Sequence, residues 1–520
     1  MKSRILDKVV DKTKAFLERV PKNRRKKKGQ FFTSIETAEY MAGMFDLSGL
    51  PEEVRILDPG TGSGILSAAV VDRLNDFVFS AEKTAGGNAP GPIRSIKLTC
   101  YETDDEIQPL LEENLECIRK ISVIPVEYEL IKKHYILAQG DAFERAVMQG
   151  GETAEDVSSK YDMVVSNPPY FRIPRNDPSA QAMPTVVHGT PNLYFLFAAM
   201  SLFHLKPGAE MVYIIPRSWT SGLYFAYFRK YLLSRGKLEH IHLFGSRDKV
   251  FKEEEVLQET MIIKVKKATD KPDHVQITSS QSTSDFLNIS SVMVPYSSVV
   301  AGKDKYVFLP INTDQIHVIS KIHLFQKTMP EEGIRMRTGI VVDFRQWEEL
   351  RKTPGDHVVP LFYSQHIRDG RVHHRPSGKE YDWIADEKPG LVQKNKNYVF
   401  CKRFTAKEER RRLQCGIYLA EDFGKYSLIG TQNKINYVDS MDGSDMDLPT
   451  TYGVYALLNS TLFDTYYRIL NGSTQVNSTE INSIPVPPME TIREIGRKLL
   501  KTGDLTTANC DSVLSEVAYG

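Results

Sequence analysis

The chain has 520 residues, which is more than one ordinary domain needs and predicts two. Hydrophobic residues make up 41% and charged residues 26%, the balance of a globular protein with a sizeable core. The net charge of +1 identifies no partner, no apolar run reaches the ~18 residues of a membrane span, and five cysteines without a CxxC pair argue against a zinc ribbon or a disulfide framework. The N-terminus lacks an apolar signal region, so we expect a cytoplasmic protein without a membrane partner.

Residues 1–28 are predicted to form a short amphipathic helix followed by a basic run. Apolar residues recur at helical spacing over the first 20 positions, and 22–28 (KNRRKKK) is almost entirely cationic. Such a run is usually a solvated segment, and contact with phosphate is the alternative.

From about residue 54 onward, short β-rich runs alternate with helical stretches, as in the crossover units of a mostly parallel sheet. The predicted strands are 54–57, 96–101, 135–137, 163–165, 211–215, 241–244 and 260–265. Residues 81–95, rich in Gly, Pro and Ala, are predicted as a loop. The rhythm ends near residue 275. We therefore expect a doubly wound, Rossmann-like α/β catalytic domain over 29–275, a connecting segment over 276–329 and a mixed α+β domain over 330–520.

A glycine-rich turn follows the first predicted strand, in 56–64 (ILDPGTGSG). Glycines permit positive φ and a close approach of the backbone to a ligand, and the helix that follows offers free N–H groups. The GxGxG spacing of Gly60, Gly62 and Gly64, with Asp58 at the strand end, favours S-adenosylmethionine over a dinucleotide. A plain tight turn is the alternative.

Two further motifs follow predicted strands. Glu102 ends the second strand, where a carboxylate can accept both ribose hydroxyl hydrogens of a nucleoside, although a surface glutamate is an equal alternative. The segment 139–143 (QGDAF) follows the predicted third strand. Asp141 could accept from an adenine amino group and Phe143 could pack near the ring, but taken alone the motif is more simply a helix-capping aspartate.

The strongest motif is 166–170 (SNPPY), directly after the apolar run 163–165. Two prolines fix the backbone and remove two donors, so the Asn167 side chain and the Pro168 carbonyl can both accept hydrogens from one –NH2 group. Tyr170 offers a face on which a base can stack. An exocyclic amine is a poor nucleophile because its lone pair is delocalised, and accepting its hydrogens makes the nitrogen more electron-rich. Direct methyl transfer then requires neither a metal nor a covalent intermediate.

Together these motifs resemble the gamma-type, TaqI-like DNA adenine-N6 methyltransferases of type II restriction-modification systems. The resemblance covers about 27–268 and includes the family's N-terminal cofactor segment at 29–33 (GQFFT) and a second aromatic position at 249–251 (KVF). Further family blocks match 192–194, 206–208 and 214–219. In the C-terminal half, segments that look like target-recognition domains are 402–404, 407–411, 433–437, 457–460 and 484–487.

The resemblance implies a role for each matching position. The residues implied to hold the cofactor S-adenosylmethionine are Thr33, Asp58, Gly60, Gly62, Glu102, Asp141 and Phe143. Asn167 and Pro168 would hold the adenine N6, and Tyr170 and Phe251 would sandwich the flipped ring. The DNA-binding candidates of the second domain are Lys402, Arg403, Arg410, Asn433 and Lys434.

Three other functions are compatible with parts of this pattern. Protein-glutamine methyltransferases use the same NPPY tetrapeptide, but they are much shorter and leave the last 250 or so residues unexplained. An RNA base methyltransferase is a closer alternative. A catalytically silent DNA-binding subunit would be free to lose the intact motifs. We expect duplex DNA as the partner, bound between the two domains, and a restriction endonuclease, if present, as a separate protein.

Overall fold

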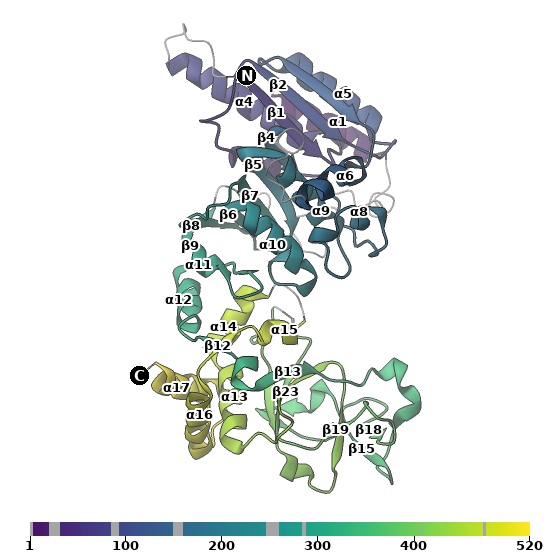
Figure 1. Cartoon of the computed structure of the whole chain (residues 1–520), viewed down its shortest axis with the longest axis vertical. Helices are drawn as coiled ribbons and strands as arrows, with labels where there is room; N and C mark the ends of the chain where they lie inside the picture. The colour runs from purple at the N-terminus through teal and green to yellow at the C-terminus, as the bar shows by residue number, and fades with distance from the viewer. Residues whose placement is uncertain are drawn as a thin grey trace. The chain divides into compact units, whose positions relative to one another are not determined.

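The computed structural model describes residues 4–19, 32–84, 93–148, 160–245, 259–282, 286, 288–406, 408–471 and 475–519. The chain forms two compact units, Met1–Ile311 and Asn312–Gly520 (Figure 1).

The first unit is built on a nine-stranded sheet with the order β3-β2-β1-β4-β5-β7-β6-β8-β9. Its strands are β1 (Glu53–Pro59), β2 (Ser95–Tyr101), β3 (Val126–Ile131), β4 (Tyr161–Ser166), β5 (Leu205–Pro216), β6 (Gly236–Phe244), β7 (Thr260–Lys267), β8 (His274–Ser280) and β9 (Ser290–Pro295). Strands β1 to β5 pair in parallel, whereas β7 is antiparallel to both β5 and β6. The chain moves outward from β1 to β3 and then returns to β4 on the other side of β1. This reversal leaves a crevice at the carboxyl ends of β1 and β4.

Helices cover both faces of this sheet. They are α1 (Ile5–Leu17), α3 (Ile35–Gly43), α4 (Ile65–Thr84), α5 (Gln108–Ile121), α6 (Tyr135–Met148), α8 (Pro178–Gln181), α9 (Leu193–His204), α10 (Ala226–Arg235) and α11 (Tyr296–Val299). Helices α1, α3, α4 and α5 pack together, and α6, α9 and α10 form a second group (Figure 1). Every residue of α9 is buried, which explains why its sequence is apolar on all sides. The doubly wound, mostly parallel fold is confirmed.

The predicted third strand, 135–137, is wrong. These residues form the first turn of α6, and the third parallel strand is β3, which ends before two lysines. A short apolar run such as YIL cannot be assigned to strand or helix by periodicity. Strand β3 escaped notice because it lies at the sheet edge, where its sequence VEYELI alternates polar and apolar residues. The other six predicted strands fall within β1, β2, β4, β5, β6 and β7.

The segment expected to connect two domains, 276–329, is divided differently by the structure. Strands β8 and β9 extend the nine-stranded sheet to Pro295, and the first compact unit ends at Ile311. In the expected loop 81–95, α4 continues to Thr84 and β2 begins at Ser95.

The second unit mixes sheets and helices, as expected. Its sheets have the orders β13-β23-β20-β21-β17-β16 and β14-β18-β15-β22-β19, and β12 pairs with β24. The strands are β12 (Lys327–Thr328), β13 (Ile334–Thr338), β14 (Leu350–Arg351), β15 (Val358–Phe362), β16 (Ile367–Arg368), β17 (Arg371–Val372), β18 (Trp383–Ala385), β19 (Gln393–Lys394), β20 (Tyr398–Lys402), β21 (Cys415–Tyr418), β22 (Leu428–Thr431), β23 (Ile435–Ser440) and β24 (Pro485–Val486). A separate two-stranded pair, β10 (Val300–Ala301) with β11 (Tyr306–Val307), belongs to the first unit. The helices are α12 (Thr313–Ile322), α13 (Leu448–Asn459), α14 (Thr461–Leu470), α15 (Ser478–Ile481), α16 (Met489–Thr502) and α17 (Thr507–Ala518). Among the described residues, no helix has the length and apolar character of a membrane span.

Candidate active site

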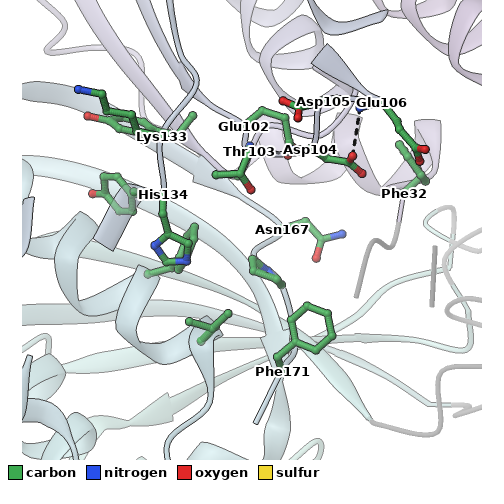
Figure 2. Close-up of a pocket in the computed structure, with 16 residues that line it drawn as sticks. Phe32, Glu102, Thr103, Asp104, Asp105, Glu106, Lys133, His134, Asn167 and Phe171 are labelled. Carbon is green, nitrogen blue, oxygen red and sulfur yellow. Dashed lines mark hydrogen bonds between the residues drawn. The ribbon is translucent and has the colours of Figure 1, made fainter. Parts of the chain in front are cut away.

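A cavity of about 740 Å³ opens at the carboxyl ends of β1, β2, β3 and β4 (Figure 2). It is lined by Phe32, Gly60, 101–106, 133–135, Asn167, Pro169, Phe171, Leu193 and Phe197. The cavity lies where the strand order reverses, the usual place for a ligand in such sheets, and its volume is that of a small-molecule site.

The glycine-rich turn after β1 forms one wall of this cavity. Gly60 and Gly62 have φ values of +101° and +60°, in the region that favours glycine. A Cβ on Gly60 would lie 3.4 Å from the Phe197 ring, so a side chain there would also fill the cavity edge. The turn is fixed to β2 because the Gly60 N–H donates to the Tyr101 carbonyl at 3.0 Å.

Asp58 lies beneath the turn rather than on the cavity surface. Its side chain is 1% exposed, and its Oδ2 accepts a hydrogen bond from Ser67 Oγ at 2.7 Å. Among the described residues, Oδ1 has no hydrogen-bond partner. Burial, with a smaller contribution from the charge of Glu102, raises the pKa of Asp58 to about 7. The structure therefore places Asp58 where it supports the turn.

Glu102 lines the cavity and is hydrogen-bonded to the glycine-rich turn. Its Oε2 accepts from the Gly62 N–H at 3.0 Å, and its Oε1 accepts from the N–H groups of Thr103 and Asp104 at 2.8 Å each. Burial raises the pKa of Glu102 above its usual value. A carboxylate offers about four lone-pair positions, so this one retains the capacity to accept ligand hydroxyl hydrogens.

Asn167 lies just after β4 and also lines the cavity. Its Nδ2 donates to Thr33 Oγ1 at 3.3 Å, and its Oδ1 accepts from the Tyr170 hydroxyl at 2.7 Å. The same hydroxyl lies 2.9 Å from the Ile214 carbonyl oxygen of β5. The structure thus brings together Thr33, Asn167 and Tyr170, and the two neighbours fix the orientation of the Asn167 amide.

Tyr170, which was expected to offer its ring to the substrate base, is buried instead. Tyr170 is only 9% exposed and packs edge-on against Tyr194, and burial raises its pKa well above the usual value. The next residue, Phe171, lines the cavity instead, and Figure 2 shows its ring beside Asn167. An aromatic residue directly after NPPY was the sequence signal for Phe171. Pro168 is buried, and Phe251 lies outside the described residues.

Asp141 and Phe143 are not brought to this cavity. Both lie within α6, where Asp141 is exposed and its carbonyl accepts from Arg145 Nε at 3.0 Å. Phe143 is fully buried against Phe203 and Tyr231. Their expected position after the third strand followed from the incorrect strand assignment, so the structure does not support contact with the cofactor.

His134 occupies the position after β3 that was expected for Asp141. Its ring lines the cavity opposite Asn167 (Figure 2) and lies edge-on to Phe197, with ring centroids 5.9 Å apart. Its Nδ1 is buried without a hydrogen-bond partner in the described part of the chain, and burial lowers the pKa of His134. Correct assignment of β3 would have identified this residue.

Four of the expected DNA-binding residues of the second unit lie together. The Arg403 N–H donates to the Lys434 carbonyl at 2.9 Å, and Arg403 Nη1 donates to the Asn433 carbonyl at 3.0 Å. Lys402 precedes Arg403 at the end of β20, and its Nζ donates to Gln414. The fifth residue, Arg410, is exposed in the loop between β20 and β21.

Known proteins resemble both units. Residues 93–251 match the model of the Eco57I restriction-modification methylase family. The chain is 32% identical to the type II methyltransferase M.BsuBI of Bacillus subtilis, over 98% of this chain and 97% of that protein. It is also 32% identical to the type II methyltransferase M.PstI of Providencia stuartii, over 95% and 93% of the two chains.

A solved structure extends the likeness in fold to almost the whole chain. The type IIL restriction-modification enzyme MmeI, in complex with DNA, aligns with 99% of this chain and 74% of its own, with a TM-score of 0.52 at 10% identity. The relationship to M.BsuBI and M.PstI carries the assignment, and it confirms the expected S-adenosylmethionine cofactor. The chain belongs to the type II DNA methyltransferases of restriction-modification systems.

Proposed function

We propose that this methyltransferase modifies the N6 amino group of one adenine within a specific site in duplex DNA. The observation that carries the proposal is the placement of Asn167 in the cavity, with its amide oriented by Thr33 and Tyr170 and followed by two prolines. A planar amide oxygen beside a backbone carbonyl is suited to accept both hydrogens of one exocyclic amine.

The residues around the cavity fit the cofactor, which supplies an electrophilic methyl group when bound. Gly60 and Gly62 leave the turn without side chains, and Glu102 has acceptor capacity for ribose hydroxyls. Thr33 and Asp58 would act indirectly, through Asn167 and through the turn. Burial lowers the pKa of His134, and its ring, whose Nδ1 has no hydrogen-bond partner among the described residues, could hydrogen-bond a ring nitrogen of the cofactor's adenine.

Asn167 and Pro168 would raise the reactivity of the substrate amine. Asn167 Oδ1 already accepts from Tyr170 but has a second lone pair. Together with the Pro168 carbonyl it would accept the two N6 hydrogens, which draws the nitrogen toward a tetrahedral geometry and frees its lone pair for attack. The methylated nitrogen would then release one proton to solvent, while the acceptor pair holds the remaining hydrogen.

The target adenine would have to leave the helical stack, because N6 is paired inside a duplex. Extrusion costs a few kcal/mol, which stacking on an aromatic side chain can offset. Phe171 presents its ring to the cavity, and Tyr170 and Phe251 remain proposed contributors. The enzyme would act on cytoplasmic DNA, with any cognate endonuclease as a separate protein.

The product distinguishes this proposal from its alternatives. DNA from cells that express the wild type or Asn167→Ala should be digested to nucleosides and analysed by mass spectrometry, with methylation-sensitive sequencing of the same DNA. We expect N6-methyladenine at one sequence with the wild type and none with the variant. N4-methylcytosine, or methylation of RNA in place of DNA, would contradict the proposal.

A further inference from the structure

The second unit presents two large aromatic side chains to solvent on one short segment, 342–349, which we call the aromatic turn. Phe344 is 77% exposed and Trp347 is 66% exposed. Both lie on single turns of 3₁₀ helix, η5 (Asp343–Arg345) and η6 (Trp347–Glu349). Paired exposure of this kind is costly to a protein's solubility and is typical of a surface that is covered by a partner.

Hydrogen bonds hold the aromatic turn in a defined conformation. The Val342 N–H donates to Gln346 Oε1 at 2.6 Å, and the N–H groups of Arg345 and Gln346 donate to the Val342 carbonyl at 2.9 and 3.1 Å. The Arg345 guanidinium lies over the Phe344 ring, 5.5 Å from its centroid. The flat faces of these side chains are therefore displayed by a fixed backbone, which reduces the entropy lost when a partner binds.

The aromatic turn is joined to the segment that carries the expected DNA-binding residues. The Asn433 N–H donates to the Val341 carbonyl at 2.8 Å, and Gln432 Nε2 donates to Asp343 Oδ2 at 3.4 Å. Because Arg403 donates to the Asn433 carbonyl, this network links the aromatic turn to Arg403 through the segment 432–433.

The aromatic turn and its neighbours carry charges of both signs. Arg345 and Lys434 are exposed, Asp343 accepts a hydrogen bond from the neutral Gln432 amide, and Glu349 forms an ion pair with Lys388 at 2.9 Å. Glu348 is the exposed carboxylate of the turn. A surface for a protein partner is usually depleted of lysine at its centre, whereas stacking aromatics among arginine, lysine and amide groups suit a nucleic acid.

We propose that the aromatic turn contacts the bases of the DNA substrate through Phe344 and Trp347, with Arg345 beside them. The inference rests on the proposed function for the identity of the substrate as duplex DNA. It adds a contact surface to that function, in which the aromatic side chains stack on bases at steps that the enzyme opens or kinks. Asn433 and Lys434 would contact the adjoining groove of the DNA.

DNA binding by full-length variants tests the proposal. Phe344→Ala and Trp347→Ala should each weaken binding to an unmethylated duplex that contains the recognition sequence. The expected loss is about 5- to 150-fold, the range that corresponds to one lost base stack. Met441→Ala is the matched control, because Met441 is 45% exposed but follows the far end of β23, about 20 Å along the strand from Lys434. We expect wild-type affinity for this control and unchanged cofactor binding for all three.

Tryptophan fluorescence gives a direct readout. Trp219 is buried and Trp383 is half-buried, so Trp347 is the exposed indole among the three tryptophans of the chain. DNA should quench the wild-type emission, and Trp347→Phe should remove most of that quenching. Unchanged affinity of the alanine variants, or equal quenching in Trp347→Phe, would overturn the inference even if the wild type methylates adenine. Absence of N6-methyladenine with intact wild-type protein would instead refute the proposed function.

Discussion

Replacement of Asp58 by Asn tests whether a buried carboxylate beneath the glycine-rich turn destabilises the cofactor-free protein. Burial raises the pKa of Asp58 to about 7 from an ordinary value near 3.8. The unfolded chain therefore releases this proton at a lower pH than the folded protein does. Stability should fall as the pH rises through this window, and the loss should be complete above about pH 7.

The size of the stability loss can be estimated over the part of this pH range in which unfolding is easily measured. Between about pH 5 and pH 7 the wild type should lose about 3 kcal/mol relative to Asp58→Asn, at about 1.36 kcal/mol per pH unit. Asparagine keeps an acceptor for Ser67, and any cost of burying its amide is the same at both pH values and cancels. With an unfolding entropy of about 2.1 cal/mol/K per residue over the first unit, this difference corresponds to about 4 °C in the unfolding midpoint.

The assay is thermal unfolding of the full-length, cofactor-free protein at about pH 5 and about pH 8, followed by circular dichroism. The midpoint of Asp58→Asn minus that of the wild type should rise between the two pH values. Asp46→Asn is the control, because hydrogen bonds from Ser48 lower the pKa of Asp46, and its stabilising effect is lost only in more acidic solution. If Asp58→Asn changes the midpoint equally at both pH values, the carboxylate is not ionised against a burial penalty, and the reasoning is refuted.

Three further predictions concern the cavity. Glu102→Ala should weaken cofactor binding by ~1–3 kcal/mol in calorimetry, because donors of the turn lose their acceptor; an unchanged dissociation constant would remove Glu102 from the cofactor site. Asn167→Ala should abolish methyl transfer while calorimetric cofactor binding persists, and near-normal turnover would contradict its role at N6. His134→Phe should keep the ring packing but weaken cofactor binding, and because burial lowers the pKa of His134, the wild type should lose stability relative to this variant as the pH falls below about 6.5. Equal cofactor affinity in His134→Phe would show that the imidazole makes no contact with the cofactor.

The parts of the site that the sequence predicted are those whose chemistry is local. The turn at Gly60 and Gly62, the strand end at Glu102 and the motif at Asn167 each follow a buried parallel strand, and a run of apolar residues marks such a strand clearly. Because parallel strands place their carboxyl ends at one edge of the sheet, three separate motifs could be expected to line one cavity. The structure places all three there.

The parts that escaped prediction depend on contacts between distant segments. Because β3 lies at the sheet edge, its sequence alternates polar and apolar residues, and the apolar run 135–137 was predicted as the strand instead. The residue expected after the third strand was therefore Asp141 and not His134. The aromatic turn is a second case, because nothing in the sequence shows that Phe344 and Trp347 stay exposed until the bonds from Gln432 and Asn433 fix the segment against its neighbour. A sequence motif identifies the residues proposed to perform the reaction, whereas the residues proposed to contact the cofactor's base or the DNA depend on which strands become edges and which turns remain uncovered. His134→Phe and Trp347→Phe therefore test properties of this fold that no local motif carries.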